Sequence, residues 1–300
     1  MTATARQKGG SPSGRASLPL LRRVRPWLGI VPFTVFVAIF LLWPAWGVFR
    51  AALQPVRDSE TPAMVEAVRG QYLQSILFSL RLSAITAALG AVIGTMVAAA
   101  IVRLRHFSGL RNFVVGYSAV AANLGGIPLA FAFVAALGMQ GLYTKALSAL
   151  GIDLLDLGFT ISGFAGIVIV YLYFQIPLMT LVMLPALDGL RSQLREAAEN
   201  LGATAGMYWR RVGIPLLFPS LLGGALLLFA NAFAAYATAF ALSAGASRLV
   251  SVQIRFFLQG ETITGKANLG YALSAWMIIV MIVAMTGYLG LRRVSESWRR

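Results

Sequence analysis

The segment that comes closest to a chemical motif is 260–267, Gly-Glu-Thr-Ile-Thr-Gly-Lys-Ala. Its spacing nearly matches the phosphate-binding loop G-x-x-x-x-G-K-[ST], in which the backbone and the lysine hold phosphates and a hydroxyl group holds Mg²⁺. Ala267 stands where the hydroxyl residue would be, and the residues before the loop do not predict a strand. We therefore expect this chain itself to bind neither ATP nor Mg²⁺.

Other catalytic chemistry is poorly represented in the sequence. There is no cysteine and a single histidine, His106, so a thiol nucleophile is excluded and too few ligands remain for a Cys/His metal site. We find no hydrolytic triad and no pair of carboxylates placed for acid–base catalysis. The sequence predicts no catalytic residue, no metal site and no cofactor in this chain, and hence no enzyme.

The most distinctive segment is 196–215, EAAENLGATAGMYWRRVGIP, which is polar and charged between two long uncharged runs. Residues 196–201 favour a helix, and Gly202 ends it because glycine tolerates turn conformations that other residues resist. Residues 203–211 can then form a second short helix, with Thr204 as its N-cap.

We predict that this segment is the centre of a helix–turn–helix elbow, residues 188–215, and that Pro215 begins the next membrane segment. Such an elbow is suited to dock into a groove of a partner protein. The alternative is an ordinary surface hairpin between two membrane helices. The apolar patch that we expect on the elbow consists of Leu201, Met207, Tyr208 and Trp209.

Composition indicates a membrane protein with several spans. Hydrophobic residues make up 58% of the 300 residues and charged residues only 12%, and the mean hydropathy is +0.77. The net charge of +15 would suit nucleic-acid binding if it formed a basic face on a folded domain. The arginines instead cluster in short segments beside apolar runs, as membrane topology requires. We therefore expect no nucleic-acid partner.

The fold class that we predict is an all-α membrane protein with six transmembrane helices. A spanning helix needs about 20 apolar residues. Residues 1–25 predict a disordered basic tail, and 26–300 predict one transmembrane domain. A cleaved signal peptide is the alternative for the first window, but that window is long and lacks an A-x-A site. The six uncharged windows are 26–49, 82–102, 112–144, 157–187, 212–247 and 267–291.

The distribution of positive charge predicts the orientation. With the N-terminus in the cytosol, 17 of the 25 Lys and Arg residues lie in cytosolic segments and seven lie in outer segments. Both termini are then cytosolic, and the elbow lies in the cytosol between the fourth and fifth spans. The outer segments are 51–81, 145–156 and 248–266, and an amphipathic piece, 72–80, is expected to lie along the membrane interface.

Polar side chains inside the windows are candidates for lining a solute path. Each Asn or Gln could instead tie helices together. No Asp, Glu or Lys lies deep in a window, which argues against proton or ion coupling. Gly90 and Gly94 form G-x-x-x-G, which predicts close packing of two helices. The path candidates are Asn123, Gln175, Asn231 and Tyr236.

The elbow resembles the cytoplasmic signature of permease subunits of binding-protein-dependent ABC importers. That signature reads E-A-A, any three residues, G, any nine residues, an aliphatic residue, any one residue, a second aliphatic residue and P. Here it is carried by Glu196, Ala197, Ala198, Gly202, Val212, Ile214 and Pro215. Residues 123–133, 138–141 and 216–242 are in turn similar to permeases of the polyamine, ferric-iron and aminoethylphosphonate importers.

This resemblance implies a type I importer fold in a prokaryotic plasma (inner) membrane. It implies a second permease subunit, usually forming a heterodimer, two cytosolic ATPase subunits that bind ATP and Mg²⁺, and an extracytoplasmic binding protein that delivers a small-molecule solute. The coupling elbow would then include Glu196, Ala197, Ala198, Gly202, Ala203, Met207, Tyr208 and Pro215.

The solute that we expect is a polyamine such as spermidine or putrescine, with ferric iron or a phosphonate as alternatives. Two other classes of protein remain open at this point. A passive channel would need a charged ring or a carbonyl filter, and a membrane-embedded enzyme would need a cluster of ionisable residues at one membrane face. Neither pattern is found in the sequence.

Overall fold

The structure is a computed structural model, which describes residues 30–297 except 57–59, 105–106, 191, 244, 246–247 and 260–265. Every named element within these residues is a helix. Six of the helices are long and apolar enough to cross a membrane, which confirms the predicted fold class. The tail 1–25, His106 and both glycines of the phosphate-loop look-alike lie outside the described residues.

The first span, Val31–Ala52, consists of α2 (Val31–Val37), a π-helical turn (Ala38–Leu42) and α3 (Trp43–Ala52). Its N-terminal part belongs to a separate compact unit that ends at Gly47. No residue of α2 or of the π-helical turn is buried by the chain. A helix that is apolar all round and unburied is suited to lipid or to another protein.

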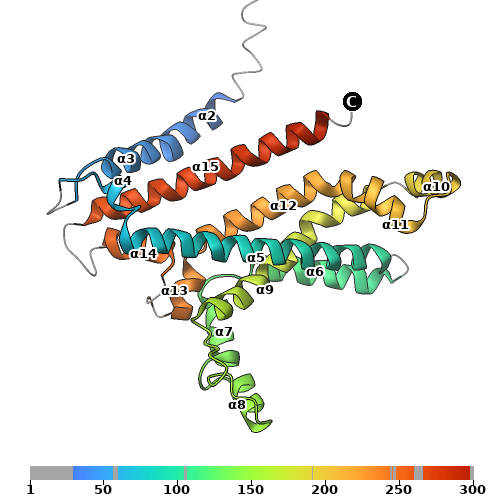
Figure 1. Cartoon of the computed structure of the whole chain (residues 1–300), viewed down its shortest axis with the longest axis horizontal. Coiled ribbons are helices and arrows are strands. Elements are labelled where there is room, and N and C mark those ends of the chain that lie inside the picture. The colour runs from blue at the N-terminus through green and yellow to red at the C-terminus, as the bar shows by residue number, and fades with distance from the viewer. Residues whose placement is uncertain are drawn as a thin grey trace, which may run out of the picture. The chain divides into compact units, whose positions relative to one another are not determined.

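The rest of the chain is built on a central group of three helices: α5 (Gly70–Arg103), α9 (Phe164–Asp188) and α12 (Ile214–Ala234) (Figure 1). Each of the three packs against the other two. Helix α6 (Ser108–Asn123) lies against α9, and α15 (Ala267–Ser297) lies against α12.

Small residues explain how closely these helices pack. A Cβ atom added at Gly94 of α5 would lie 2.5 Å from Cβ of Met179 on α9, and one added at Gly224 of α12 would lie 2.6 Å from Sδ of the same methionine. At Gly90, an added Cβ would lie 2.9 Å from Cδ2 of Leu228 on α12. The close packing predicted from G-x-x-x-G is therefore confirmed.

The outer part of α5 differs from the sequence-based expectation. Residues 72–80 do not form a separate interfacial helix, because α5 is continuous from Gly70 and about 51 Å long. The reason is tertiary: its serines face α14 (Val250–Gln259) rather than a lipid headgroup. Ser79 Oγ accepts a hydrogen bond of 2.9 Å from the Val250 N–H, and Ser75 Oγ accepts one of 2.8 Å from Gln253 Nε2.

Two windows that we predicted as single spans are interrupted. The third is divided into α6 and α7 (Ile127–Leu137) at Gly126, whose φ is +79°. The fifth is divided after Ala234, and α13 (Ala237–Ser243) follows. The two breaks lie together, because the Gly126 N–H donates a 2.9 Å hydrogen bond to Thr238 Oγ1.

The bundle formed by residues 48–297 has two distinct ends. The end of α5, the start of α6 and α10 (Ser192–Asn200) lie at one end, and α4 (Ala63–Glu66) and α14 lie at the other (Figure 1). This sorting agrees with the predicted alternation of cytosolic and outer segments, although the orientation itself stays a prediction.

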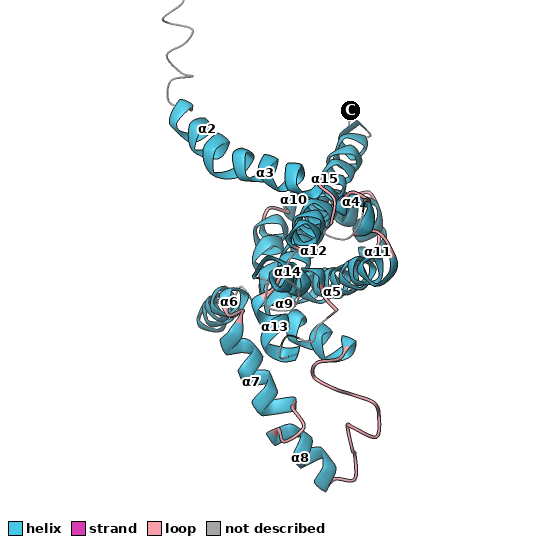
Figure 2. Cartoon of the chain, turned by 90° about the vertical axis from the view of Figure 1, so that its left-hand side faces the viewer, coloured by secondary structure: helices cyan, strands magenta, loops and turns pink. Residues whose placement is uncertain are grey.

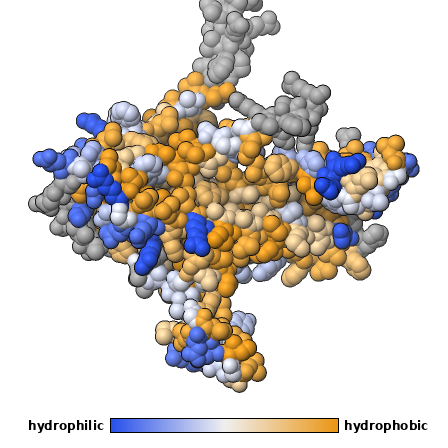
Figure 3. Space-filling model, in the orientation of Figure 1, coloured by the Kyte–Doolittle hydropathy of each residue, from blue (hydrophilic) through white to orange (hydrophobic). Residues whose placement is uncertain are grey.

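On the face shown in Figure 3, hydrophilic residues gather mainly near the two ends of the bundle, with a broad hydrophobic region between them. Helix α7 and the following α8 (Leu142–Ala149) extend away from the central helices in both ribbon views (Figures 1 and 2).

Candidate docking elbow and solute path

The turn of the elbow is a glycine-ended helix terminus. Helix α10 ends at Asn200, and Gly202 follows with a φ of +79°. The Gly202 N–H donates to the Glu199 carbonyl and the Ala203 N–H donates to the Ala198 carbonyl, both at 2.9 Å. This pair of bonds is the Schellman arrangement, which satisfies carbonyls that a helix end leaves open. The predicted turn at Gly202 is confirmed.

The second half of the elbow differs from the prediction of a separate short helix. Thr204 does cap α11 (Ala205–Tyr208), accepting a 3.3 Å hydrogen bond from the Met207 N–H. From there the helix continues through a π-helical turn, Trp209–Gly213, directly into α12. Pro215 thus lies within a continuous helical stretch, just after the π-helical turn, in the first turn of α12. Proline has no N–H to donate, and a π-helical turn just before it lets the helix continue without that donor. The second half of the elbow and the fifth span therefore form one continuous helical rod, 205–234.

The exposed apolar patch of the elbow is close to the one predicted, with one correction. Leu201 is 88% exposed, and Leu194, Met207 and Trp209 are also exposed. Tyr208, which we expected in the patch, is only 5% exposed and packs edge-to-face against Trp209. Its ring, at the last residue of α11, is covered in part by the ring of Trp209, which follows it along the helix. We define the elbow patch as Leu194, Leu201, Met207 and Trp209.

Charged and small residues surround this patch. Glu196 and Ala197 are exposed, whereas Ala198 and Ala203 are half-buried at the turn. Arg195 Nε lies 2.8 Å from Glu199 Oε1 along α10, and this hydrogen bond raises the pKa of the arginine. Both side chains are largely exposed, so the pair adds little stability.

An ion pair ties α6 to the helix that leads into the elbow. Arg111 Nη2 lies 2.7 Å from Asp188 Oδ2, and each side chain is 32% exposed. Sequence reasoning did not single out this pair, because only the fold brings together two residues that are 77 positions apart.

The four predicted path residues do not share one surface. Gln175 is fully buried in α9, and its Nε2 donates to the Leu228 carbonyl at 3.2 Å and to Thr86 Oγ1 at 3.4 Å. It ties α9 to α12 and α5. Asn123 is exposed and donates to the Ala119 carbonyl in its own helix.

The other two candidates, Asn231 and Tyr236, lie near the end of the fifth span that is remote from the elbow. Asn231 is exposed, and Tyr236 is half-buried. The Tyr236 hydroxyl accepts a hydrogen bond from Arg255 of α14. A role of these residues in a solute path stays a prediction.

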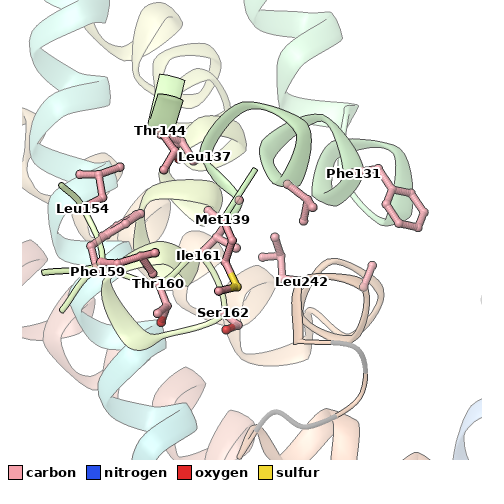
Figure 4. Close-up of a pocket in the computed structure, with 14 residues that line it drawn as sticks. Phe131, Leu137, Met139, Thr144, Leu154, Phe159, Thr160, Ile161, Ser162 and Leu242 are labelled. Atoms are coloured by element: carbon pink, nitrogen blue, oxygen red, sulfur yellow. The ribbon is translucent and has the colours of Figure 1, made fainter. Parts of the chain in front are cut away.

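Two cavities lie away from the elbow. The first, of about 410 Å³, is bounded by α7, the segment before α9, and α13 (Figure 4). Apolar side chains dominate its lining, with Thr144, Thr160 and Ser162 as the polar exceptions. The absence of a charged group among these lining residues makes it poorly suited to a hydrophilic solute.

The second cavity, of about 390 Å³, lies between the end of the fifth span and α14. We call it the Arg255 pocket. Sequence reasoning missed it, since Arg255 counted only as one of the charges of an outer segment. Its lining residues are Tyr236, Ser251, Ile254, Arg255, Leu258 and Gln259.

Comparisons with known proteins give a consistent set of relatives, although no family model matches the chain. The chain is 27% identical over 218 residues to the molybdenum transport system permease protein ModB of Mycobacterium bovis, covering 71% of this chain and 77% of that protein. It is 26% identical over 157 residues to the spermidine/putrescine transport system permease protein PotC of Haemophilus influenzae, covering 52% of this chain and 53% of that protein.

The fold is also found among solved structures. A chain of the bacterial alginate ABC transporter, solved in complex with an alginate pentasaccharide-bound periplasmic protein, superposes on this chain with a TM-score of 0.68. The two chains are 20% identical, and the match covers 92% of this chain and 98% of that one. This likeness extends over nearly all of the helices described above.

Proposed function

We infer that this chain, a permease subunit of the ABC importer family, forms part of a solute path across a prokaryotic inner membrane and is driven by a separate ATPase that docks on the elbow. The chain is a multi-pass membrane protein and not itself an enzyme. Its proposed partners are two cytosolic ATPase subunits, which would bind ATP and Mg²⁺, a second permease subunit in a heterodimer, and an extracytoplasmic binding protein.

The observation that carries this proposal is the form of the elbow. It leaves four large apolar side chains exposed, from 37% for Trp209 to 88% for Leu201, and a helical hairpin without a partner gains nothing from exposing them. The second half of the elbow, from Ala205 onwards, continues into the fifth span without a break, so a partner that moves this half would move the span with it. A passive channel would have no need of such a device.

The solute is the finer part of the proposal. The resemblance to polyamine importers favours spermidine or putrescine, with ferric iron or a phosphonate as alternatives. The relatives themselves are named for unlike solutes, molybdenum in ModB and spermidine or putrescine in PotC. The proposed role as a permease therefore does not depend on the polyamine assignment.

The proposed docking can be tested with Leu201→Asp, which places a charge at the most exposed apolar residue of the elbow. We expect co-purification of the ATPase subunit and solute uptake both to fall about tenfold or more, as for a central interface residue. Leu150→Asp is the matched control, because Leu150 is 77% exposed but lies outside the elbow. Unchanged ATPase binding and uptake in Leu201→Asp would contradict the proposal.

A further inference from the structure

We propose that the cavity of about 410 Å³ beside α7 binds one acyl chain of a membrane glycerophospholipid, and that Thr144 holds the ester group of that chain. We call this cavity the α7 pocket. The proposal goes beyond the proposed function and does not depend on it, because it requires only that the chain lie in a membrane.

The lining of the α7 pocket suits a hydrocarbon chain. Its volume of about 410 Å³ falls in the range of ligand pockets, about 300–1,000 Å³. Apart from Gly138 and three hydroxyl residues, every lining residue has an apolar side chain, and none of the lining residues is charged. Burying methylene groups in such a lining is favourable, whereas burying a charged group without a partner is costly.

The pocket lies within a part of the chain that is suited to cross the membrane. Helices α7 and α8 belong to the third candidate span, Ile127–Ala149, and both ribbon views show them projecting from the central helices (Figures 1 and 2). Two of the lining residues in this span, Phe131 and Met139, are 60% and 73% exposed. The pocket therefore opens on an apolar surface at membrane depth, where acyl chains are the surrounding solvent.

Thr144 supplies the observation that points to a ligand with a polar group. This lining residue is only 8% exposed, and its Oγ1 is buried without a hydrogen-bond partner among the described residues. Most buried hydroxyl groups have a partner, because leaving one unpaired costs free energy. In Figure 4 the other two hydroxyl residues, Thr160 and Ser162, lie apart from Thr144. The lining thus offers few side-chain partners to a water molecule at Thr144, which would need two to four polar partners.

An ester satisfies Thr144 without bringing a charge into the pocket. The threonine hydroxyl can donate one hydrogen bond, and the carbonyl of a glycerol ester is a neutral acceptor at the head of an acyl chain. A free fatty acid carries a carboxylate at neutral pH, which no lining residue could neutralise. We therefore assign the ligand as an esterified chain and not as a free acid.

A bound chain would strengthen the contact of α7 with the rest of the molecule. The walls of the pocket come from α7, the segment 154–162 and α13 (Figure 4). At its start α7 is tied to α13 by the hydrogen bond from the Gly126 N–H to Thr238 Oγ1. An acyl chain in the pocket would add apolar contacts between the same two helices further along α7, so added lipid should raise the thermal midpoint of the protein.

The first test locates the lipid in the complete complex with its ATPase, second permease and binding protein. The complex is reconstituted in vesicles of phosphatidylethanolamine and phosphatidylglycerol with a trace of phosphatidylethanolamine that carries a diazirine in one acyl chain. After illumination, mass spectrometry should find adducts on lining residues such as Leu137, Phe159 and Leu242. Ala241→Phe fills the pocket and should reduce these adducts about tenfold. Ala135→Phe is the matched control, because Ala135 is an exposed alanine of α7 that does not line the pocket.

The second test isolates the hydroxyl of Thr144. Thr144→Val keeps the shape of the side chain, and it should weaken the binding of phosphatidylethanolamine about two- to tenfold through the loss of one hydrogen bond. The thermal midpoint of the delipidated complex should be no lower than that of the wild type, because an unpaired hydroxyl has been removed, but added phosphatidylethanolamine should raise it less. Thr286→Val is the control, because the exposed Thr286 hydroxyl already donates to the Ile282 carbonyl at 2.9 Å in its own helix.

Four results would overturn the inference. Adducts spread evenly over the lipid-facing helices would show only general contact with the membrane, and unchanged adducts in Ala241→Phe would place the lipid elsewhere. Absence of adducts from the pocket in the assembled complex would indicate that the second permease subunit covers it. Labelling by a diazirine-bearing palmitic acid as strong as labelling by the phospholipid would remove the ester assignment. If Ala241→Phe does not fold, Thr144→Val decides, since an equal rise of the midpoint with lipid in this variant and the wild type would contradict the proposal.

Discussion

Gly202 is the residue on which the shape of the elbow depends most directly. Its φ of +79° is a conformation that side chains with a Cβ resist, yet an added Cβ would meet no atom within 4 Å. The cost of replacing it therefore comes from the backbone and not from crowding. Asn tolerates this region better than other residues, whereas Ala pays about 1 kcal/mol.

We therefore expect solute uptake to decrease in the order Gly202→Asn, Gly202→Ala, Gly202→Asp. The first two are uncharged and differ mainly in backbone strain, whereas aspartate adds a charge beside the apolar Leu201 where the ATPase would dock. Uptake and ATPase co-purification, measured at equal membrane levels of each variant, test this order. Full uptake and normal ATPase binding by Gly202→Asp would show that this turn has no part in coupling.

The sequence predicts those residues of the site that lie close together along the chain, but not those that only the fold brings together. The E-A-A…G spacing located the elbow because every member lies within one short segment. The surroundings of Arg255 could not be predicted in the same way, because its contacts Tyr236 and Phe240 come from a different part of the fold. Tyr208 is the opposite case: we expected it in the exposed apolar patch of the elbow, and the fold buries it.

At the scale of the helices, apolar windows predicted the number of spans but not where they break. Gly126 bonds to Thr238, 112 residues away, and this contact joins the interruption of the third window to that of the fifth. In the local sequence, a serine that will bond to α14 looks the same as a serine that will face a lipid headgroup. The prediction that residues 72–80 lie along the membrane interface was therefore wrong.

The contact of α5 with α9 gives a prediction about stability. Gly94→Ala should lower the thermal midpoint of the purified chain, because the new Cβ would lie 2.5 Å from Met179 Cβ and 2.7 Å from the Ile176 carbonyl oxygen. Neither a Cβ nor a backbone oxygen can move aside cheaply, so we expect a cost of about 1–3 kcal/mol.

Gly287→Ala is the control, since an added Cβ at Gly287 in α15 would meet nothing within 4 Å. Thermal unfolding of both variants in the same detergent gives the comparison. Equal midpoints for Gly94→Ala and Gly287→Ala would show that α5 and α9 do not pack at this glycine as described.

At the scale of the whole molecule, the proposed mechanism depends on which end of the bundle faces the cytosol. The structure sorts the elbow and α4 to opposite ends, as the charge distribution predicted (Figure 1). The excess of Lys and Arg on the elbow side is the physical ground for assigning that side to the cytosol. If the assignment were reversed, the elbow could not meet a cytosolic ATPase.

The absence of cysteine from the sequence makes the orientation directly measurable, because a single introduced cysteine is the only thiol in the chain. Gln193→Cys places one on the exposed surface of α10, and Glu60→Cys places one on the exposed segment before α4. In intact cells a membrane-impermeant maleimide should label Glu60→Cys, and it should label Gln193→Cys only after the membrane is permeabilised. Labelling of Gln193→Cys in intact cells would reverse the topology, and with it the docking of an ATPase on the elbow.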